Sequence, residues 1–145
     1  MNTQLKRAQL LIKLAKRKEE QAGAVLAEWR ERVATQRHQL TELAGYQKAY
    51  LAAAGEASQT VHQLQANRQF LSQLDGVISE QRLRMQQLEQ QFEHYCRQWQ
   101  GLHQRRKVLE DYRERLDLSA QKALNKMWDK LCDELAARPD APQNR

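Results

Sequence analysis

The sequence predicts an all-α protein: a long antiparallel coiled coil of two helices, a helical hairpin in which the second helix is the longer. Three observations support this prediction. Two long heptad series of apolar residues are present, a single break separates them, and the residue types that favour helices dominate the composition. The mean hydropathy of −0.90 indicates that most side chains face water, so the apolar residues fit a thin seam better than a globular core.

The first heptad series predicts a helix over about residues 3–53. Two rows of residues run through it, with spacings that alternate between three and four. Eleven of the fourteen positions are apolar or aromatic, which is the pattern of a coiled-coil seam. The two rows are Leu5, Ile12, Glu19, Leu26, Val33, Leu40 and Gln47, and Ala8, Ala15, Ala22, Trp29, Gln36, Leu43 and Tyr50.

The heptad pattern is lost over about residues 54–64, which hold Gly55, Ser58 and Thr60. This is the only stretch of the sequence that predicts a turn. Short connections between consecutive helices make them antiparallel neighbours. We therefore expect the chain to fold back once, here.

The second heptad series predicts a helix over about residues 65–137. Its rows are Leu71, Ile78, Met85, Phe92, Trp99, Arg106, Arg113, Ala120 and Met127, and Leu74, Gln81, Leu88, Tyr95, Leu102, Leu109, Leu116 and Ala123. Pro139 should end the helix, because the residue before a proline is pushed out of helical angles. Residues 1–138 therefore form one hairpin domain, and residues 139–145 are expected to be a disordered tail.

The second helix should extend past the first by about twenty residues, or about 30 Å. An apolar face on a single helix cannot bury itself and needs a partner. This overhang contains Ala120, Leu124, Met127, Trp128, Leu131 and Leu135.

The net charge of +6 raises the possibility of a basic coiled coil that binds nucleic acid. The distribution of the charge argues against it. Residues 1–32 hold eight basic and four acidic side chains, whereas residues 67–117 hold nine and eight, which is typical of solvated helix faces. We therefore expect no nucleic-acid partner.

No catalytic residue, metal ligand or cofactor site is predicted, so the protein is not expected to be an enzyme. The four histidines form no i, i+4 pair, the spacing of a zinc site is absent, and five scattered glycines make no phosphate-binding loop. The sequence also contains no secretory signal and no run of apolar residues long enough to insert into a membrane. The thiols of Cys96 and Cys132 are expected to be free, as in a reducing cytoplasm.

Two groups of residues have both a structural and a functional interpretation. Polar seam residues such as Gln36 and Arg106 are expected to set the register of the two helices. Near the turn, two apolar residues beside the seam form a local face together with two residues of the seam row. This face is either a widened seam packed on the tyrosines of the first helix or a docking patch for another protein. Its residues are Phe70, Leu74, Val77 and Gln81.

Several segments of the sequence resemble the flagellar export protein family FliJ. The resemblance covers nearly the whole chain, and its most specific part is the order of a tyrosine motif, a turn and a glutamine-rich helix. The matching segments are "YQKAY" at Tyr46–Tyr50, "RQFLSQLDGVISEQRLRMQQLE" from Arg68, then Trp99, Arg105–Arg106, Leu109, and "DELAAR" at Asp133–Arg138.

The resemblance implies a cytoplasmic part of the bacterial flagellar type III export apparatus, held peripherally at the cytoplasmic face of the inner membrane. Members of the family look like the central shaft of a rotary ATPase. They bind the hexameric FliI ATPase ring and the cytoplasmic domain of the export gate FlhA, and this coupling serves proton-driven export. FliH and the export chaperones are further candidate partners. By position, the gate-binding face falls on Phe70, Leu74, Val77 and Gln81, where the family often has histidine at the last position.

The terminal end of the hairpin is the candidate surface for the ATPase ring, because a shaft inside a ring benefits from being narrow and smoothly charged. The residues expected to face the ring are Lys6, Arg7, Lys13, Arg17, Met127, Trp128 and Asp133. The alternatives are the equivalent stalk of a virulence type III secretion system, the nucleic-acid-binding coiled coil and a purely structural oligomer.

Overall fold

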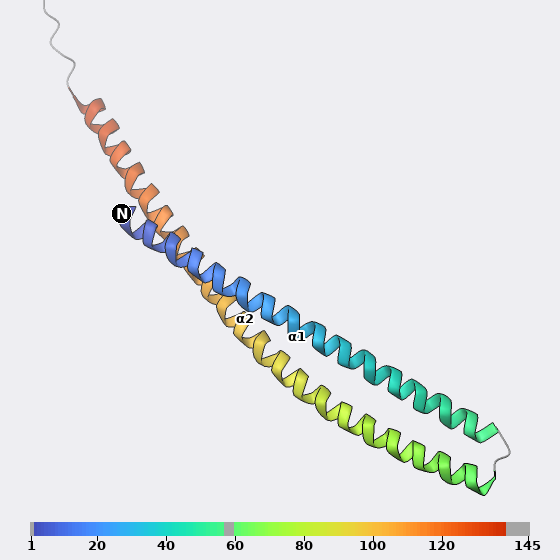
Figure 1. Cartoon of the computed structure of the whole chain (residues 1–145). Helices are drawn as coiled ribbons and strands as arrows, with labels where there is room; N and C mark the ends of the chain where they lie inside the picture. The colour runs from blue at the N-terminus through green and yellow to red at the C-terminus, as the bar shows by residue number, and fades with distance from the viewer. Residues whose placement is uncertain (1, 57–59, 139–145) are drawn as a thin grey trace, which may run out of the picture. The chain divides into compact units, whose positions relative to one another are not determined.

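The computed structural model describes residues 2–56 and 60–138, which form two helices, α1 (Asn2–Glu56) and α2 (Val61–Ala137) (Figure 1). The predicted fold class is confirmed: the described chain is all-α, and α2 is the longer helix, with 77 residues against 55. The chain divides into two units. In their described parts, the hairpin unit comprises residues 20–56 and 60–101, and the terminal unit comprises residues 2–19 and 102–138.

Both helices are longer at the connection than predicted, because α1 continues to Glu56 and α2 begins at Val61. Three alanines at 52–54 favour the extension of α1. At the start of α2, Thr60 and Gln63 form a capping box. The backbone N–H of Thr60 donates to Gln63 Oε1 at 3.2 Å, and that of Gln63 donates to Thr60 Oγ1 at 3.3 Å.

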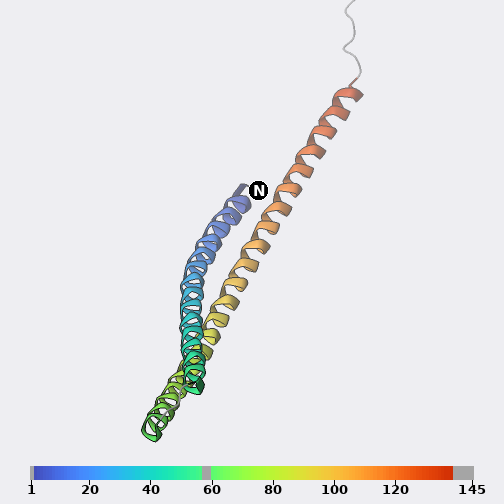
Figure 2. The ribbon, with the colours of Figure 1, turned by 90° about the vertical axis from the view of Figure 1, so that its right-hand side faces the viewer.

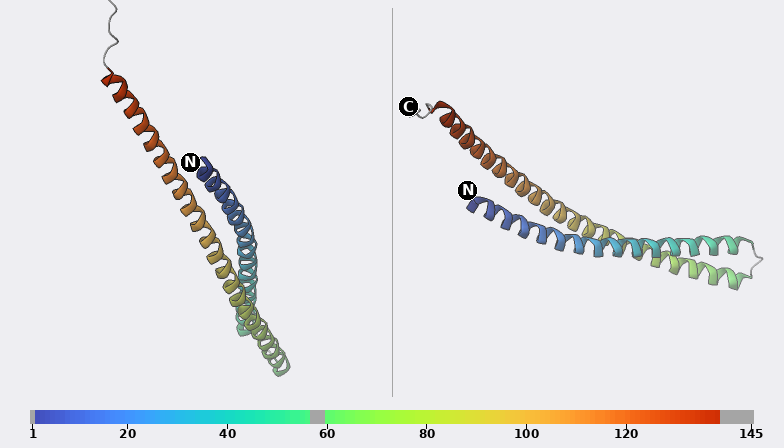
Figure 3. Two further views of the ribbon diagram at one scale, coloured as in Figure 1. Left: turned by 90° about the vertical axis from the view of Figure 1, so that its left-hand side faces the viewer. Right: turned by 90° about the horizontal axis from the view of Figure 1, so that it is seen from above.

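The hairpin unit packs α1 against α2 side by side and antiparallel (Figures 1 and 3). Val33, Ile78 and Met85 are buried in its seam. The rings of Trp29 and Tyr95 stack with their centroids 5.3 Å apart. The seam of this unit therefore combines aliphatic and aromatic side chains from both helices.

The predicted seam agrees closely with the burial of the side chains. All fourteen seam positions of α1 are buried or half-buried. The two rows of α2 are buried or half-buried as far as Ala123, with Arg113 as the exception, and Met127 is exposed. The seam on α2 thus ends near Ala123.

In the terminal unit, small or slender residues (Ala8, Ile12 and Ala15) form the buried seam of α1. The last turns of α2 extend past the N-terminus of α1 (Figures 1 and 2). The overhang is exposed as expected from Leu124 onward, but Ala120 is half-buried and belongs to the seam. Helix α2 ends at Ala137, before Pro139. The tail predicted at 139–145 lies outside the described residues. Cys96 and Cys132 are both free thiols.

Candidate protein-binding surfaces

The four residues of the predicted gate-binding face do not all point outward. Phe70 and Val77 are 46% and 43% exposed, whereas Leu74 and Gln81 are half-buried at seam positions of α2. Two side chains of the four are therefore available to a partner, and the other two help to hold α2 against α1.

Gln81 is engaged inside the hairpin unit by Gln36, a seam residue that is only 5% exposed. The side-chain amide of Gln36 donates to the backbone carbonyl of Gln81 at 3.4 Å and also to its side-chain oxygen. A buried amide must find partners, so this contact favours one alignment of the two helices. This geometry is consistent with the register-setting interpretation of Gln36.

Phe70 combines the two interpretations that the sequence left open. Its ring contacts that of Tyr50, with centroids 4.7 Å apart, so it widens the seam, yet nearly half of its side chain remains exposed. Tyr50 in turn donates its hydroxyl hydrogen to Asn67 Oδ1. Tyr46 is 67% exposed and adds a second exposed aromatic side chain to this unit.

The basic residues predicted to face the ring are all exposed in the terminal unit. They are Lys6, Arg7, Lys13 and Arg17. Residues 2–19 carry six basic side chains and a single acidic one, Glu19. The predicted residues on α2 are exposed as well: Met127 and Trp128 are 62% and 65% exposed, and Asp133 lies on the last turns of the overhang.

Glu19 is a seam residue whose charge is matched from α2. Its carboxylate lies 2.7 Å from His103 Nδ1 and pairs with Nε of Arg106, and Arg106 also bonds Glu110 at 2.9 Å. The hydrogen bonds from Arg106 and then His103 lower the pKa of Glu19 below its ordinary value. Sequence reasoning treated Glu19 and Arg106 separately, although both stand out as charges within apolar rows.

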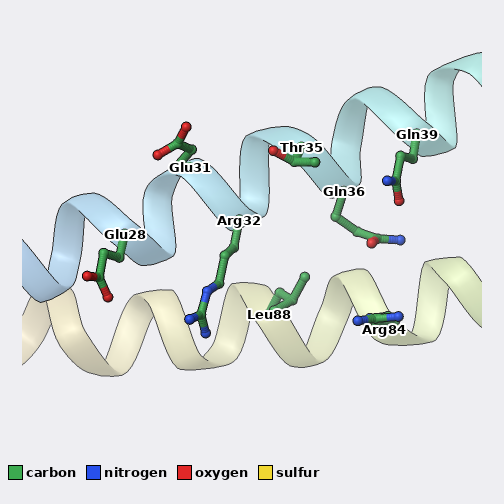
Figure 4. Close-up of a pocket in the computed structure, with 8 residues that line it drawn as sticks. All are labelled: Glu28, Glu31, Arg32, Thr35, Gln36, Gln39, Arg84 and Leu88. Atoms are coloured by element: carbon green, nitrogen blue, oxygen red, sulfur yellow. The ribbon is translucent and has the colours of Figure 1, made fainter.

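An open polar hollow lies along the seam of the hairpin unit (Figure 4). Its mixture of charges, amides and one apolar residue was not anticipated. Arg32 lies over the ring of Trp29, one turn earlier on α1, with Cζ 4.7 Å from the ring centroid. The residues that line the hollow are Glu28, Glu31, Arg32, Thr35, Gln36, Gln39, Arg84 and Leu88.

Sequence reasoning also missed exposed leucines in the terminal unit. Leu10, Leu11 and Leu14 are 59%, 48% and 46% exposed, although they stand next to the buried seam row of α1. The available signal was their position: each is one residue before or two after a seam residue, so none can share the buried line. Leu11 and Leu14 line a shallow groove between the two helices of this unit.

The described residues contain no group of three or more histidine, cysteine or acidic side chains placed to hold a metal ion. Over residues 2–56 and 60–138, neither helix has a stretch apolar enough to cross a bilayer. What the geometry offers in the described residues is a set of exposed apolar and basic surfaces.

Comparison with protein families matches the chain to the model described as "Flagellar FliJ protein" over residues 4–143. No curated protein and no solved structure matches the chain significantly. The match covers almost the entire sequence and confirms the resemblance carried by the tyrosine motif and the glutamine-rich helix. The chain therefore belongs to the FliJ family, the non-enzymatic components of flagellar type III protein export.

Proposed function

We propose that this protein is the central-stalk-like coiled coil of the export apparatus, which binds both the FliI ATPase ring and the cytoplasmic domain of the gate FlhA. It would couple them for proton-driven export at the cytoplasmic face of the inner membrane, with FliH and export chaperones as further partners. The observation that carries the proposal is the family match over residues 4–143. An exposed candidate surface in each unit supports it.

Of the three alternatives that the sequence left open, the family match argues against the virulence-system stalk and the purely structural oligomer, and the charge distribution argues against nucleic-acid binding. The matched family is described as flagellar, which favours the flagellar apparatus over a virulence secretion system. Nucleic-acid binding rests on an excess of cations that neutralise phosphates, and the hairpin unit has none, since it carries eight basic and nine acidic side chains.

Phe70 and Val77 are the residues of the gate surface that we assign to direct contact. Both lie on α2, seven residues apart, so they stand on the same side of the helix. Each keeps over two-fifths of its surface exposed, so burying the remainder against a partner contributes roughly half of the 1.5–3 kcal/mol that a fully exposed side chain would give. Leu74 and Gln81, on the seam side, support this surface from within.

Replacing both residues (Phe70→Ala with Val77→Ala) should weaken capture of the FlhA cytoplasmic domain about tenfold or more, because the apolar contact area is removed. A pull-down with purified domain measures it, and far-UV circular dichroism checks that the helices persist. Leu83→Ala is the matched control, since Leu83 lies on the same helix and is 58% exposed. Undiminished capture by the helical double variant would contradict the gate assignment.

The terminal unit is assigned to the ring. Its α1 seam is built from small residues such as Ala8 and Ala15, which let the helices approach closely, and its exposed surface on α1 is basic. A narrow shaft with a basic side on α1 suits a ring whose inner surface offers carboxylates.

Charge reversal at Lys13→Glu with Arg17→Glu should reduce stimulation of the FliI ATPase several-fold, because both exposed cations would become anions. Phosphate release by the ATPase with increasing amounts of the protein measures the effect. Lys48→Glu with Arg68→Glu makes the same change of charge on exposed residues of the hairpin unit and should leave stimulation unchanged. Equal effects of both double variants would show that net charge alone matters and would remove the ring assignment.

A further inference from the structure

One side of the terminal unit carries an apolar groove between α1 and α2. Leucines from both helices form most of it, and a buried alanine lies at its base. Two cations complete the lining. The residues are Leu11, Leu14, Ala15 and Lys18 from α1 and Leu102, Arg105 and Leu109 from α2.

The groove is a second row of side chains beside the seam. Leu11, Leu14 and Lys18 follow one another at spacings of three and four, so they form a continuous ridge on α1. Leu11 and Leu14 are about half exposed. One exposed leucine alone is ordinary on a protein surface, but two adjacent ones on the same ridge form an apolar surface. Tyr112, which is 47% exposed, continues the apolar surface one turn beyond Leu109 on α2.

The other side of the same seam is closed by charge. Lys16 follows Ala15 directly, whereas Leu14 precedes it, so the two flank the seam on opposite sides. Lys16 Nζ lies 3.9 Å from a carboxylate oxygen of Glu110, which also accepts a hydrogen bond from Arg106. Of the two sides of the seam in the described terminal unit, the one that carries the groove presents apolar residues without an ion pair over them.

The charges at the groove have one sign. Lys18 and Arg105 are its only charged residues, and within the described chain neither takes part in an ion pair. The one acidic side chain of α1 in this unit, Glu19, is already engaged by Arg106 and His103. The cations of the groove are therefore available to carboxylates from another molecule.

We propose that this groove binds an amphipathic helix of a partner protein whose flanks are acidic. The apolar residues of that helix would pack between α1 and α2 as the third strand of a coiled coil, and its carboxylates would meet Lys18 and Arg105. The ridge from Leu11 to Lys18 is about 10 Å long, which matches roughly two turns of such a helix. The site goes beyond the proposed function, because it contains none of the residues assigned to the ring or to the gate.

Two synthetic peptides test the proposal, each about three heptads long. Both carry leucine at the two seam positions of the heptad; one has glutamate and the other lysine at the flanking positions. Fluorescence anisotropy with the full chain should show binding of the acidic peptide only. Lys18→Glu with Arg105→Glu should lower the affinity for the acidic peptide about tenfold or more and should allow the basic peptide to bind.

Matched variants separate the groove from net charge. Lys107→Glu with Arg115→Glu changes the charge equally on exposed residues of α2 outside the groove, and it should leave binding of the acidic peptide intact. Leu11→Gln with Leu14→Gln should abolish binding while circular dichroism shows unchanged helicity, since both leucines are exposed.

Three results would overturn the proposal: equal loss of binding in both charge-reversal variants, full binding by the leucine variant, or displacement of the acidic peptide by duplex DNA. FlhA capture by the same variants should be unchanged. This control keeps a failure of the groove distinct from a failure of the proposed function.

Discussion

Ile78→Ala should lower the free energy of unfolding of the hairpin unit by about 2–3 kcal/mol. Ile78 is only 3% exposed and lies in the middle of a seam that two helices share. Its removal deletes apolar contacts and leaves a cavity. The expected loss stands at the lower end of the range for such substitutions, because water can enter a defect in a two-helix seam. Urea unfolding followed by circular dichroism measures it.

Two substitutions control for this prediction. Leu83→Ala removes a side chain that is 58% exposed on the same helix, so its effect should stay below about 0.5 kcal/mol. Ile78→Val removes a single methylene and should cost about 1 kcal/mol. If alanine at 78 cost no more than alanine at 83, the seam would not be the main source of stability in this unit.

The position of the seam could be predicted because the heptad repeat fixes which side of each helix is buried. Row members as different as Ala8, Trp29 and Gln36 are all buried or half-buried, so spacing predicted burial even where residue type did not. The end of α2 was predictable from Pro139 for an equally local reason.

The predicted start of α2, at about residue 65, was too late because glycine, serine and threonine at 55–60 were interpreted as turn residues. Thr60 and Gln63 carry the sequence signature of a helix N-terminus, and its capping box starts the helix at Val61. The observed connection is therefore shorter than the predicted one.

Contacts between the helices could not be predicted, because they depend on how two rows align in space. Gln81 was placed both in a seam row and on the gate-binding face, but nothing in the sequence paired it with Gln36 across the seam. The exposure of Leu11 and Leu14 was not predicted, because the heptad pattern identifies seam positions and says nothing of the residues beside them. The structure adds to the sequence where side chains of α1 and α2 meet.

Glu19→Gln should destabilise the terminal unit at neutral pH, because it removes the seam carboxylate that pairs with Arg106 and leaves that cation with Glu110 alone. Glu19 and Arg106 have side chains that are 13% and 19% exposed, so water cannot fully replace the lost partner. The same substitution should reduce the acid sensitivity of the unit. The pKa of Glu19 is lowered in the folded state by Arg106 and then by His103.

The sign of the pH effect follows from that lowering. A carboxyl whose folded pKa is below its unfolded value contributes stability that is complete above the unfolded value, 4.5 for glutamate, and is lost as the pH falls through the folded pKa. The difference in unfolding midpoint between the wild-type chain and Glu19→Gln should therefore be largest near neutral pH and should shrink below about pH 4.5.

Glu20→Gln is the matched control, since Glu20 is the exposed neighbour of Glu19. It should neither destabilise the chain nor alter its pH dependence. Replacing both partners, as in Glu19→Leu with Arg106→Leu, should recover stability relative to Glu19→Gln, because no charge is then left unpaired in the seam. A double variant as unstable as Glu19→Gln would mean that the cluster acts through its shape or through His103. Recovery would assign the destabilisation to the incompletely paired charge of Arg106 in the seam, which is the cost expected when one partner of a buried ion pair is removed.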